Sequence, residues 1–279
     1  MTPGGLGRVH TQRAVLFDDA HPLVLQSGRS LPFVEVAYET YGALDSDGGN
    51  AVFVCHALSG DAHAAGHHGD PDMRGWWDTI IGPGRPLDTE RFFVVCPNLL
   101  GGCSGTTGPT SVDPRTSRPY GLGFPLLTVR DLVAVHRALL EHIGISRLHG
   151  AIGGSLGGMQ VLQWALDHPE QIERAVLVCA SASLNAQNIA LTAIARAAIM
   201  GDPDFQEGRY LEGPRVPVAA GRQRPCSRRG SFSLGKSGRH IPMSREVAPR
   251  PPSQFLTTLR ARSPRGMHLS RCARGDAAR

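Results

Sequence analysis

The stretch Ile152-Gly153-Gly154-Ser155-Leu156-Gly157-Gly158-Met159 decides the fold class of this 279-residue chain. It contains the pattern Gly-x-Ser-x-Gly, after an apolar segment typical of a buried strand and before a helical pattern. A serine in this context lies on a sharp strand-to-helix turn, a nucleophile elbow, with its hydroxyl exposed above the sheet edge. Gly153 and Gly157 are expected to be indispensable because the strand and helix backbones pass close on either side. Ser155 is therefore the predicted catalytic nucleophile.

Two backbone N–H groups are predicted to stabilise an oxyanion beside this serine. One belongs to Leu156, at the start of the helix, where N–H donors are free and the helix dipole favours an anion. The other belongs to Leu58, in the turn that directly follows the apolar strand 51–55. His56, in the same turn, is expected to be structural, because in this kind of fold the catalytic histidine follows the serine and the acid along the chain.

Outward from the elbow, segments typical of buried strands alternate with amphipathic helical patterns. The predicted strands are 34–41, 51–55, 92–96, 148–152 and 175–179. The predicted helices are 128–143, with Thr128 as its cap and Gly144 as its stop, 159–167 and 188–200. Buried strands that alternate with helices favour a doubly wound, mostly parallel α/β sheet.

The composition is that of a folded protein, with 41% hydrophobic and 19% charged residues. No apolar run approaches the roughly 20 residues that span a bilayer, and the first residues lack the pattern of a secretion signal. The six cysteines show neither C-x-x-C nor disulfide spacing. We therefore expect a cytoplasmic protein with reduced thiols and no membrane partner.

Neither a metal nor a nucleotide is expected as a cofactor. His63 and His67 are spaced four residues apart, and His68 follows, but glycines interrupt any helix there and no cysteine lies at zinc-site spacing. We predict no metal site in this cluster. The chain also lacks a phosphate-binding Gly-x-x-x-x-Gly-Lys loop and a Gly-x-Gly-x-x-Gly turn after a strand.

Residues 215–279 differ sharply in charge from the rest of the chain. Residues 1–214 carry 14 Lys and Arg against 22 Asp and Glu, a net charge of −8, whereas residues 215–279 carry 15 against 2, a net charge of +13. The tail is rich in proline, serine and arginine and keeps no hydrophobic period, which predicts disorder. A basic RNA-binding arm is the alternative, but aromatic residues for base stacking are nearly absent, so we expect no nucleic-acid partner.

Several further motifs resemble those of one family, the homoserine O-acetyltransferases of the α/β-hydrolase superfamily. They run in order over about residues 34–213, and the tail does not match. The motifs are Trp76-Trp77, Ile81-Gly82-Pro83, the run 91–109, Arg118-Pro119-Tyr120-Gly121, Phe124-Pro125, Thr128-Val129-Arg130-Asp131, the run 153–160 and the run 183–189.

The resemblance implies acetyl transfer from acetyl-CoA, as co-substrate, to the hydroxyl of L-homoserine through an acyl-serine intermediate, in methionine biosynthesis and in a cytoplasmic homodimer. It also implies an α/β-hydrolase core over 1–180 and a helical lid that begins within 181–214. Rival functions are a homoserine or serine O-succinyltransferase and a simple esterase, because the same elbow serves all of them.

The resemblance places the triad acid, the triad histidine and the arginine for the substrate carboxylate after residue 214, where this chain has no counterpart. The tail offers only Glu246, Asp276, His240 and His268, and none is assigned. One lysine among 29 basic residues suits a GC-rich gene, so we interpret 215–279 as a frameshifted replacement of the native C-terminal part. A degenerate paralogue with a genuine tail is the alternative. In either case we expect this chain to be catalytically impaired.

Overall fold

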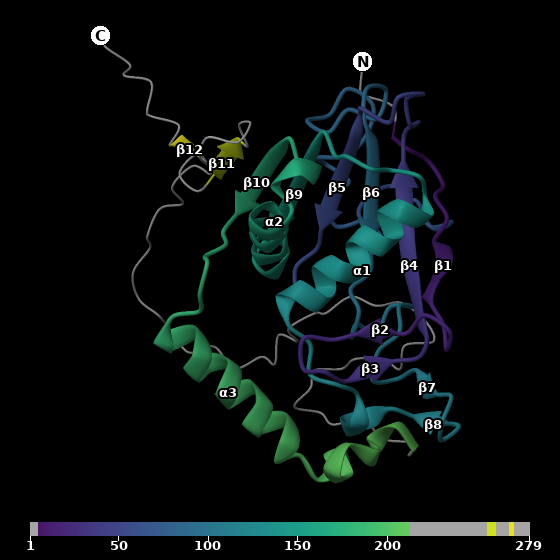
Figure 1. Ribbon diagram of the computed structural model, residues 1–279, viewed down its shortest axis with the longest axis vertical. Helices are drawn as coiled ribbons and strands as arrows, with labels where there is room; N and C mark the ends of the chain where they lie inside the picture. Colours follow the sequence, from purple (N-terminus) through teal and green to yellow (C-terminus); the bar gives the residue numbers. More distant parts are fainter. Residues whose placement is uncertain (1–4, 213–255, 261–267, 271–279) are drawn as a thin grey trace. The chain divides into compact units, whose positions relative to one another are not determined.

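The computed structural model describes residues 5–212, 256–260 and 268–270. The chain divides into two compact units: Met1–Ser183 with Thr257–Arg279, and Leu184–Leu256. The first unit contains the sheet and the candidate site (Figure 1).

A single large sheet organises the first unit. Its strands, in spatial order, are β1 (Gln12–Phe17), β4 (Val34–Tyr41), β6 (Phe93–Pro97), β5 (Ala51–Cys55), β9 (Gly150–Gly154), β10 (Arg174–Val178), β11 (Leu256–Arg260) and β12 (His268–Ser270). The pairs β6–β5, β5–β9 and β9–β10 are parallel, while β1–β4, β4–β6 and β11–β12 are antiparallel. The predicted mostly parallel α/β sheet is confirmed for the central strands β6, β5, β9 and β10.

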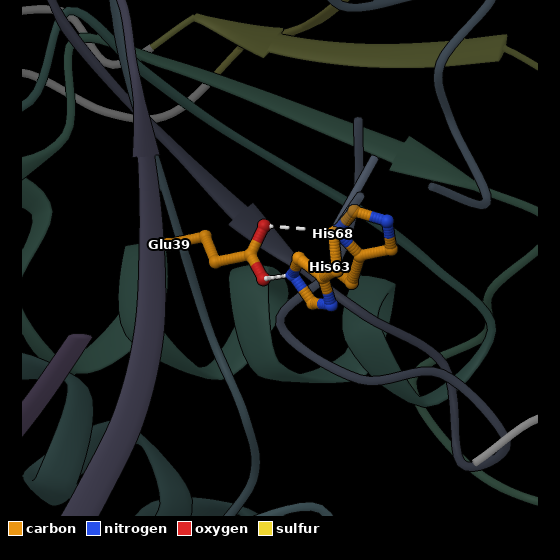
Figure 2. Close-up of side chains that lie close together, drawn as sticks. All are labelled: Glu39, His63 and His68. Carbon is orange, nitrogen blue, oxygen red and sulfur yellow. Dashed lines mark hydrogen bonds and ion pairs between the residues drawn. The ribbon is translucent and has the colours of Figure 1, made fainter. Parts of the chain in front are cut away.

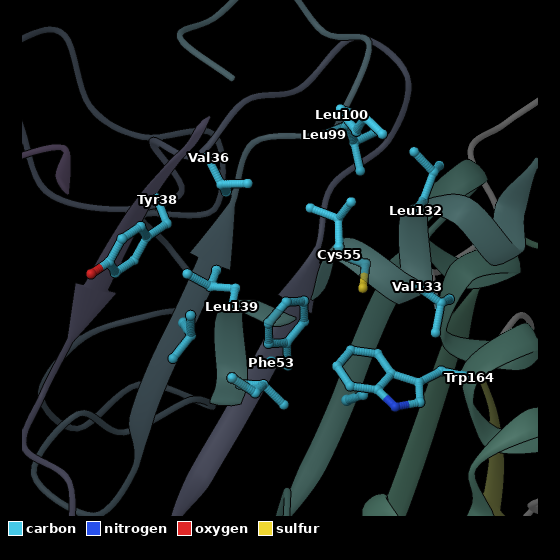
Figure 3. Close-up of a cluster of buried hydrophobic side chains, with 14 of the residues drawn as sticks. Val36, Tyr38, Phe53, Cys55, Leu99, Leu100, Leu132, Val133, Leu139 and Trp164 are labelled. Atoms are coloured by element: carbon cyan, nitrogen blue, oxygen red, sulfur yellow. The ribbon is translucent and has the colours of Figure 1, made fainter. Parts of the chain in front are cut away.

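Two helices cover one face of the sheet (Figure 1). Helix α1 (Val129–His142) begins with a capping box in which the Thr128 hydroxyl and the Asp131 carboxylate each accept the other residue's N–H. Helix α2 (Leu156–Asp167) follows the elbow directly. Between the helices and the sheet lies the main core, where Phe53 packs edge-on against Trp164 (Figure 3).

The connection between β5 and β6 covers the opposite face. Ala64, Ala65 and Ile81 from this connection are fully buried against Val54 and Val94 of the sheet. The connection after β5 therefore lies on one face of the sheet, and the connection after β9, which contains α2, lies on the other. In doubly wound sheets, neighbouring strands with connections on opposite faces form a crevice at their carboxyl ends, where ligands bind.

The remaining elements are short. Two small hairpins pair β2 (Leu23–Val24) with β3 (Ser30–Leu31), and β7 (Val112–Asp113) with β8 (Arg118–Pro119). Single-turn 3-10 helices span Gly121–Gly123 and Pro169–Gln171. The second unit contains α3 (Ala186–Met200), which uses Asn185 as its N-cap, and the irregular helical segment Pro203–Glu212.

The structure differs from the sequence prediction at element boundaries and in the tail. The strand expected at 148–152 runs two residues later, because Leu148 pairs instead in an isolated bridge with Ile172. The helix expected from Met159 begins at Leu156, and strand β1 was not anticipated. Strands β11 and β12 lie in the segment expected to be disordered. The rest of 213–279 lies outside the described residues, so the domain limits and the reading-frame interpretation stay predictions.

Candidate active site

Ser155 lies between β9 and α2 in a strained backbone conformation. Its φ is 53° and its ψ is −119°, a region that costs a non-glycine residue about 1–3 kcal/mol. The turn is held by a hydrogen bond from the Ser155 N–H to the Val178 carbonyl, at 3.0 Å, and Ser155 itself is exposed. The residue thus stands at the carboxyl edge of the parallel strands, where a substrate from solvent can reach it.

Three glycines allow the strand, turn and helix to pack this closely. A Cβ at Gly153 would lie 2.3 Å from the backbone of Gly157, and one at Gly157 would lie 2.0 Å from the Cys55 carbonyl oxygen. A Cβ at Gly158 would lie 2.4 Å from that of Ala180. Contacts this short are sterically forbidden, so any side chain at these positions would force the backbones apart.

The turn that contains Leu58 lies beside the elbow. Strands β5 and β9 are adjacent and parallel, with Cys55 in register with Gly153, and Gly157 lies against the backbone at the end of β5. The N–H of Leu156 belongs to the first turn of α2, where N–H groups have no intrahelical acceptor. The structure therefore brings the two predicted oxyanion donors to the carboxyl ends of neighbouring strands, at the crevice defined by the topology.

His56 has both ring nitrogens engaged in the protein interior. Its Nδ1 lies 2.6 Å from the Ala57 carbonyl oxygen and its Nε2 accepts the Leu99 N–H at 3.1 Å. Burial lowers its pKa. A neutral imidazole that donates at Nδ1 and accepts at Nε2 satisfies both contacts, so His56 ties two strand ends together and has no nitrogen left to act as a base for Ser155.

A base for Ser155 is not found in the described part of the chain. No described histidine or carboxylate forms a hydrogen bond with its hydroxyl. Of the tail residues considered above, His240, Glu246 and Asp276 lie outside the described residues, and His268 is described only as the first backbone position of β12. The triad acid and histidine therefore stay unassigned.

A second polar cluster surrounds Glu39 of β4, whose side chain is fully buried. His63 Nδ1 lies 3.0 Å from Glu39 Oε2, and His68 Nε2 lies 2.7 Å from Oε1 (Figure 2). The hydroxyls of Tyr41 and Thr11 donate to the same carboxylate at 2.8 and 2.9 Å. Burial alone would raise the pKa of Glu39, but the hydrogen bonds and the nearby His63 charge lower it overall.

The sequence did not single out Glu39, because the alternating pattern of 34–41 suggests a solvent-facing side for its glutamates. In the structure no residue of β4 is exposed, so both of its faces are largely covered. The nearby His67 is not part of the cluster, since its Nδ1 accepts the Gly69 N–H at 3.1 Å.

Comparison with known proteins defines the class. The model of the alpha/beta hydrolase fold family matches residues 50–258, and the chain belongs to that family. It is 63% identical over 209 residues to a homoserine O-succinyltransferase of Nocardioides sp., a match that covers 75% of this chain and 57% of that protein. The matched curated relatives are covered over only 39% to 57% of their length, so the chain spans about half of them.

Solved structures show the same likeness. The homoserine O-acetyltransferase from Bacillus anthracis superimposes with a TM-score of 0.70 at 33% identity, covering 76% of this chain and 57% of that one. Esterase E22 superimposes with a TM-score of 0.66 at 36% identity, covering 71% of this chain and 55% of that one. The resemblance to homoserine O-acyltransferases read from the sequence motifs is thereby confirmed.

Among the described residues, no helix combines the length and the apolar character needed to cross a lipid bilayer.

Proposed function

We propose that Ser155 is the nucleophile of a homoserine O-acyltransferase that works through an acyl-serine intermediate. The observation that carries this proposal is the strained elbow at Ser155, in a chain whose similarity to homoserine O-acyltransferases extends on both sides of it. A strained, exposed serine has no evident structural purpose, whereas a nucleophile needs its hydroxyl held away from the backbone.

The geometry suggests two successive acyl transfers. First, Ser155 Oγ bonds to the thioester carbonyl carbon of an acyl-CoA while its proton passes to a base; the carbon–sulfur bond then breaks and coenzyme A leaves as the thiol. Second, the hydroxyl of homoserine attacks the acyl-serine, the Ser155 oxygen leaves and regains a proton, and O-acylhomoserine is released. In both steps the N–H groups of Leu58 and Leu156 would donate to the carbonyl oxygen as it becomes negative.

The donor we propose is acetyl-CoA, as a co-substrate, with no bound cofactor. Succinyl-CoA stays an alternative donor and L-serine an alternative acceptor, since the relatives carry both acyl names. A place in methionine biosynthesis, a cytoplasmic location and a homodimer belong to the same proposal.

Turnover by this chain is expected to be low. The serine needs a base to accept its proton, and the described residues provide none. An oxyanion hole and substrate binding alone retain only about 10³–10⁴-fold catalysis over water when a triad is incomplete.

Acylation of Ser155 is the direct test. The full chain is incubated separately with acetyl-CoA and succinyl-CoA, and its peptides are analysed by mass spectrometry. We expect one acyl group on the peptide that contains Ser155, at a level that identifies the preferred donor, and none in Ser155→Ala. The matched control is Ser181→Ala, which removes another exposed serine and should label like the parent. Equal labelling of Ser155→Ala would refute the proposal.

A simple esterase is the second candidate, favoured by the likeness to esterase E22. The two functions differ in how the acyl-serine is discharged. A transferase loses its label faster when L-homoserine is added, with O-acylhomoserine as the product. An esterase loses it to water at a rate that homoserine does not change.

A further inference from the structure

The Glu39 cluster joins two segments that are distant in the sequence. Glu39 lies in β4, while His63 and His68 lie in the loop that follows β5 and the Leu58 turn. One nitrogen of each histidine points at a different oxygen of the same carboxylate (Figure 2). None of the cluster's three residues is assigned a role in the acyl transfer proposed above.

The donor set is that of a transition-metal site. One ligand atom from each of Glu39, His63 and His68 can be chosen so that all three lie within 4.8 Å of one another. Two imidazole nitrogens and one carboxylate oxygen suit Zn²⁺ and its first-row neighbours, and three protein ligands leave a position for water. Tetrahedral ligands of Zn²⁺ stand about 3.3 Å apart, and each histidine nitrogen already lies within a few tenths of an ångström of that distance from one oxygen of the Glu39 carboxylate, 3.0 Å from Oε2 for His63 and 2.7 Å from Oε1 for His68.

The surroundings of the cluster also favour a cation. Glu39 has no exposed side-chain surface, whereas the His68 side chain is 47% exposed. A second carboxyl group, that of Asp61, lies beside the cluster and accepts the backbone N–H of His63 at 3.0 Å, although burial raises its pKa. The Tyr41 and Thr11 hydroxyls donate hydrogen bonds to the Glu39 carboxylate and fix its orientation. Metal-binding carboxylates are commonly oriented by such additional hydrogen bonds. His68 can therefore admit an ion from solvent to a fixed, negatively charged ligand.

We propose that Glu39, His63 and His68 bind one divalent transition-metal ion, of which Zn²⁺ is the best match. The ion replaces the two histidine–carboxylate hydrogen bonds with metal–ligand bonds. It thereby cross-links β4 to the loop that follows β5. This proposal departs from the expectation of no metal site, which was drawn from the glycines that interrupt the histidine segment and from the absence of cysteines at zinc-site spacing.

Titration of the full chain with Co²⁺ at one fixed pH near neutrality tests the proposal. After treatment with a chelator, the chain is expected to bind one equivalent of Co²⁺ with the visible absorption of a site that contains nitrogen ligands. Excess Zn²⁺ should abolish that absorption. Co²⁺ that keeps the spectrum of the aqueous ion would overturn the proposal.

His68→Gln separates a metal site from a hydrogen-bond network. The glutamine amide can still donate to Glu39, so the network and the fold should persist, but an amide nitrogen does not ligate the metal. We expect at least a tenfold loss of Co²⁺ affinity in His68→Gln and no change in His67→Ala, whose ring lies outside the cluster. Circular dichroism of each variant verifies folding. Equal affinities in the parent and His68→Gln would refute the site even if metal binds elsewhere.

The proposed metal site and the proposed acyl transfer can be tested independently of each other. Ser155→Ala should bind Co²⁺ like the parent, and His68→Gln should still be acylated at Ser155. A thermal melt provides a second readout, since an ion at free concentration L that binds only the folded state stabilises it by RT ln(1 + L/Kd) and so raises the melting temperature more when it binds more tightly. Zn²⁺ should raise it for the parent and for Ser155→Ala, and distinctly less for His68→Gln.

Discussion

Helices α1 and α3 are nearly equal in length, with 14 and 15 residues, but they differ in what they contact. Helix α1 is amphipathic and buries seven residues against the sheet and α2, namely Asp131, Leu132, Val133, Val135, His136, Leu139 and Leu140. Helix α3 is more apolar in composition, and yet it buries none of its residues in the described structure. Apolar composition therefore does not determine burial; a complementary surface does.

The two helices also differ in the kind of support they receive. The capping box of α1 is reinforced by the chain near β2, because the Gln26 N–H donates to the buried Asp131 carboxylate at 2.8 Å. The N-cap of α3 is local, with the Asn185 side chain accepting the Asn188 N–H at 2.8 Å. Local capping can begin a helix, but most helical stability in proteins comes from packing of one face.

Truncation of one leucine in each helix should show the largest contrast. Leu139 of α1 is fully buried in the main core cluster that also contains Phe53 (Figure 3), whereas Leu191 of α3 is 57% exposed. Leu139→Ala should lower the free energy of unfolding by about 3 kcal/mol, and Leu191→Ala by no more than about 0.5 kcal/mol. Urea denaturation of both variants measures this. Equal losses would mean that α3 is packed against a surface as extensive as that of α1.

Lowering the pH should destabilise α1 but not α3. Burial lowers the pKa of His136 to about 4, from an ordinary value of 6.5. Below pH 6.5 the His136 imidazole therefore becomes protonated in the unfolded chain but stays neutral in the folded chain. The free energy of unfolding consequently decreases as the pH falls from 6.5 through 4. The total decrease in the free energy of unfolding is about 3 kcal/mol. Because it is spread over this pH range, the decrease reached near pH 5 is smaller than that expected for Leu139→Ala.

Denaturation curves recorded between pH 4 and 7 test this linkage. His136→Gln, which cannot titrate, should flatten this part of the pH dependence. Helix α3 contains no group that titrates here, since Arg196 is its one ionisable residue. Hydrogen exchange, corrected for its intrinsic pH dependence, should thus show loss of protection in α1 but no matching loss in α3. A His136→Gln profile as steep as that of the parent would assign the pH dependence to other groups.

The N-caps should give the smallest contrast. Thr128→Ala removes a cap whose partner Asp131 is buried, and should cost about 1 kcal/mol of global stability. Asn185→Ala should fray the start of α3 while leaving the urea midpoint nearly unchanged, because that helix contributes little buried surface. The midpoint and the helical circular dichroism signal together distinguish the two results. A larger midpoint change for Asn185→Ala would reverse the comparison.

Much of the fold was predictable because local patterns and tertiary packing agree. The run Ala51–Cys55 is continuously apolar and is buried along its whole length. The hydrophobic period of 128–143 and its Thr128 cap located α1 within a residue at each end. Strand β9 was placed less well, because the Gly-Ala-Ile-Gly-Gly segment has few apolar side chains from which to recognise a strand. Strand β1, at the sheet edge, has a mixed burial pattern that carries a weaker signal.

The residues of the candidate sites also differ in whether local sequence or long-range contacts reveal them. Ser155 and its flanking glycines were recognisable because a strand-to-helix turn this tight imposes residue types at fixed spacing. Glu39 was not recognisable from the sequence, because its partners His63 and His68 lie more than twenty residues away along the chain. They contact it only when β4 and the loop after β5 come together.

By itself, the sequence determined the order of the central strands and of helices α1, α2 and α3, the position of the elbow and the likeness to homoserine O-acetyltransferases, since each depends on neighbours within a few residues. Only the tertiary structure decided which apolar helix is buried, that the turns after β5 and β9 share one crevice, and that a buried carboxylate meets two histidines. These properties depend on contacts between distant segments. Hydrophobic and charged side chains acquire their burial and partners from such contacts, and not from their place in the chain.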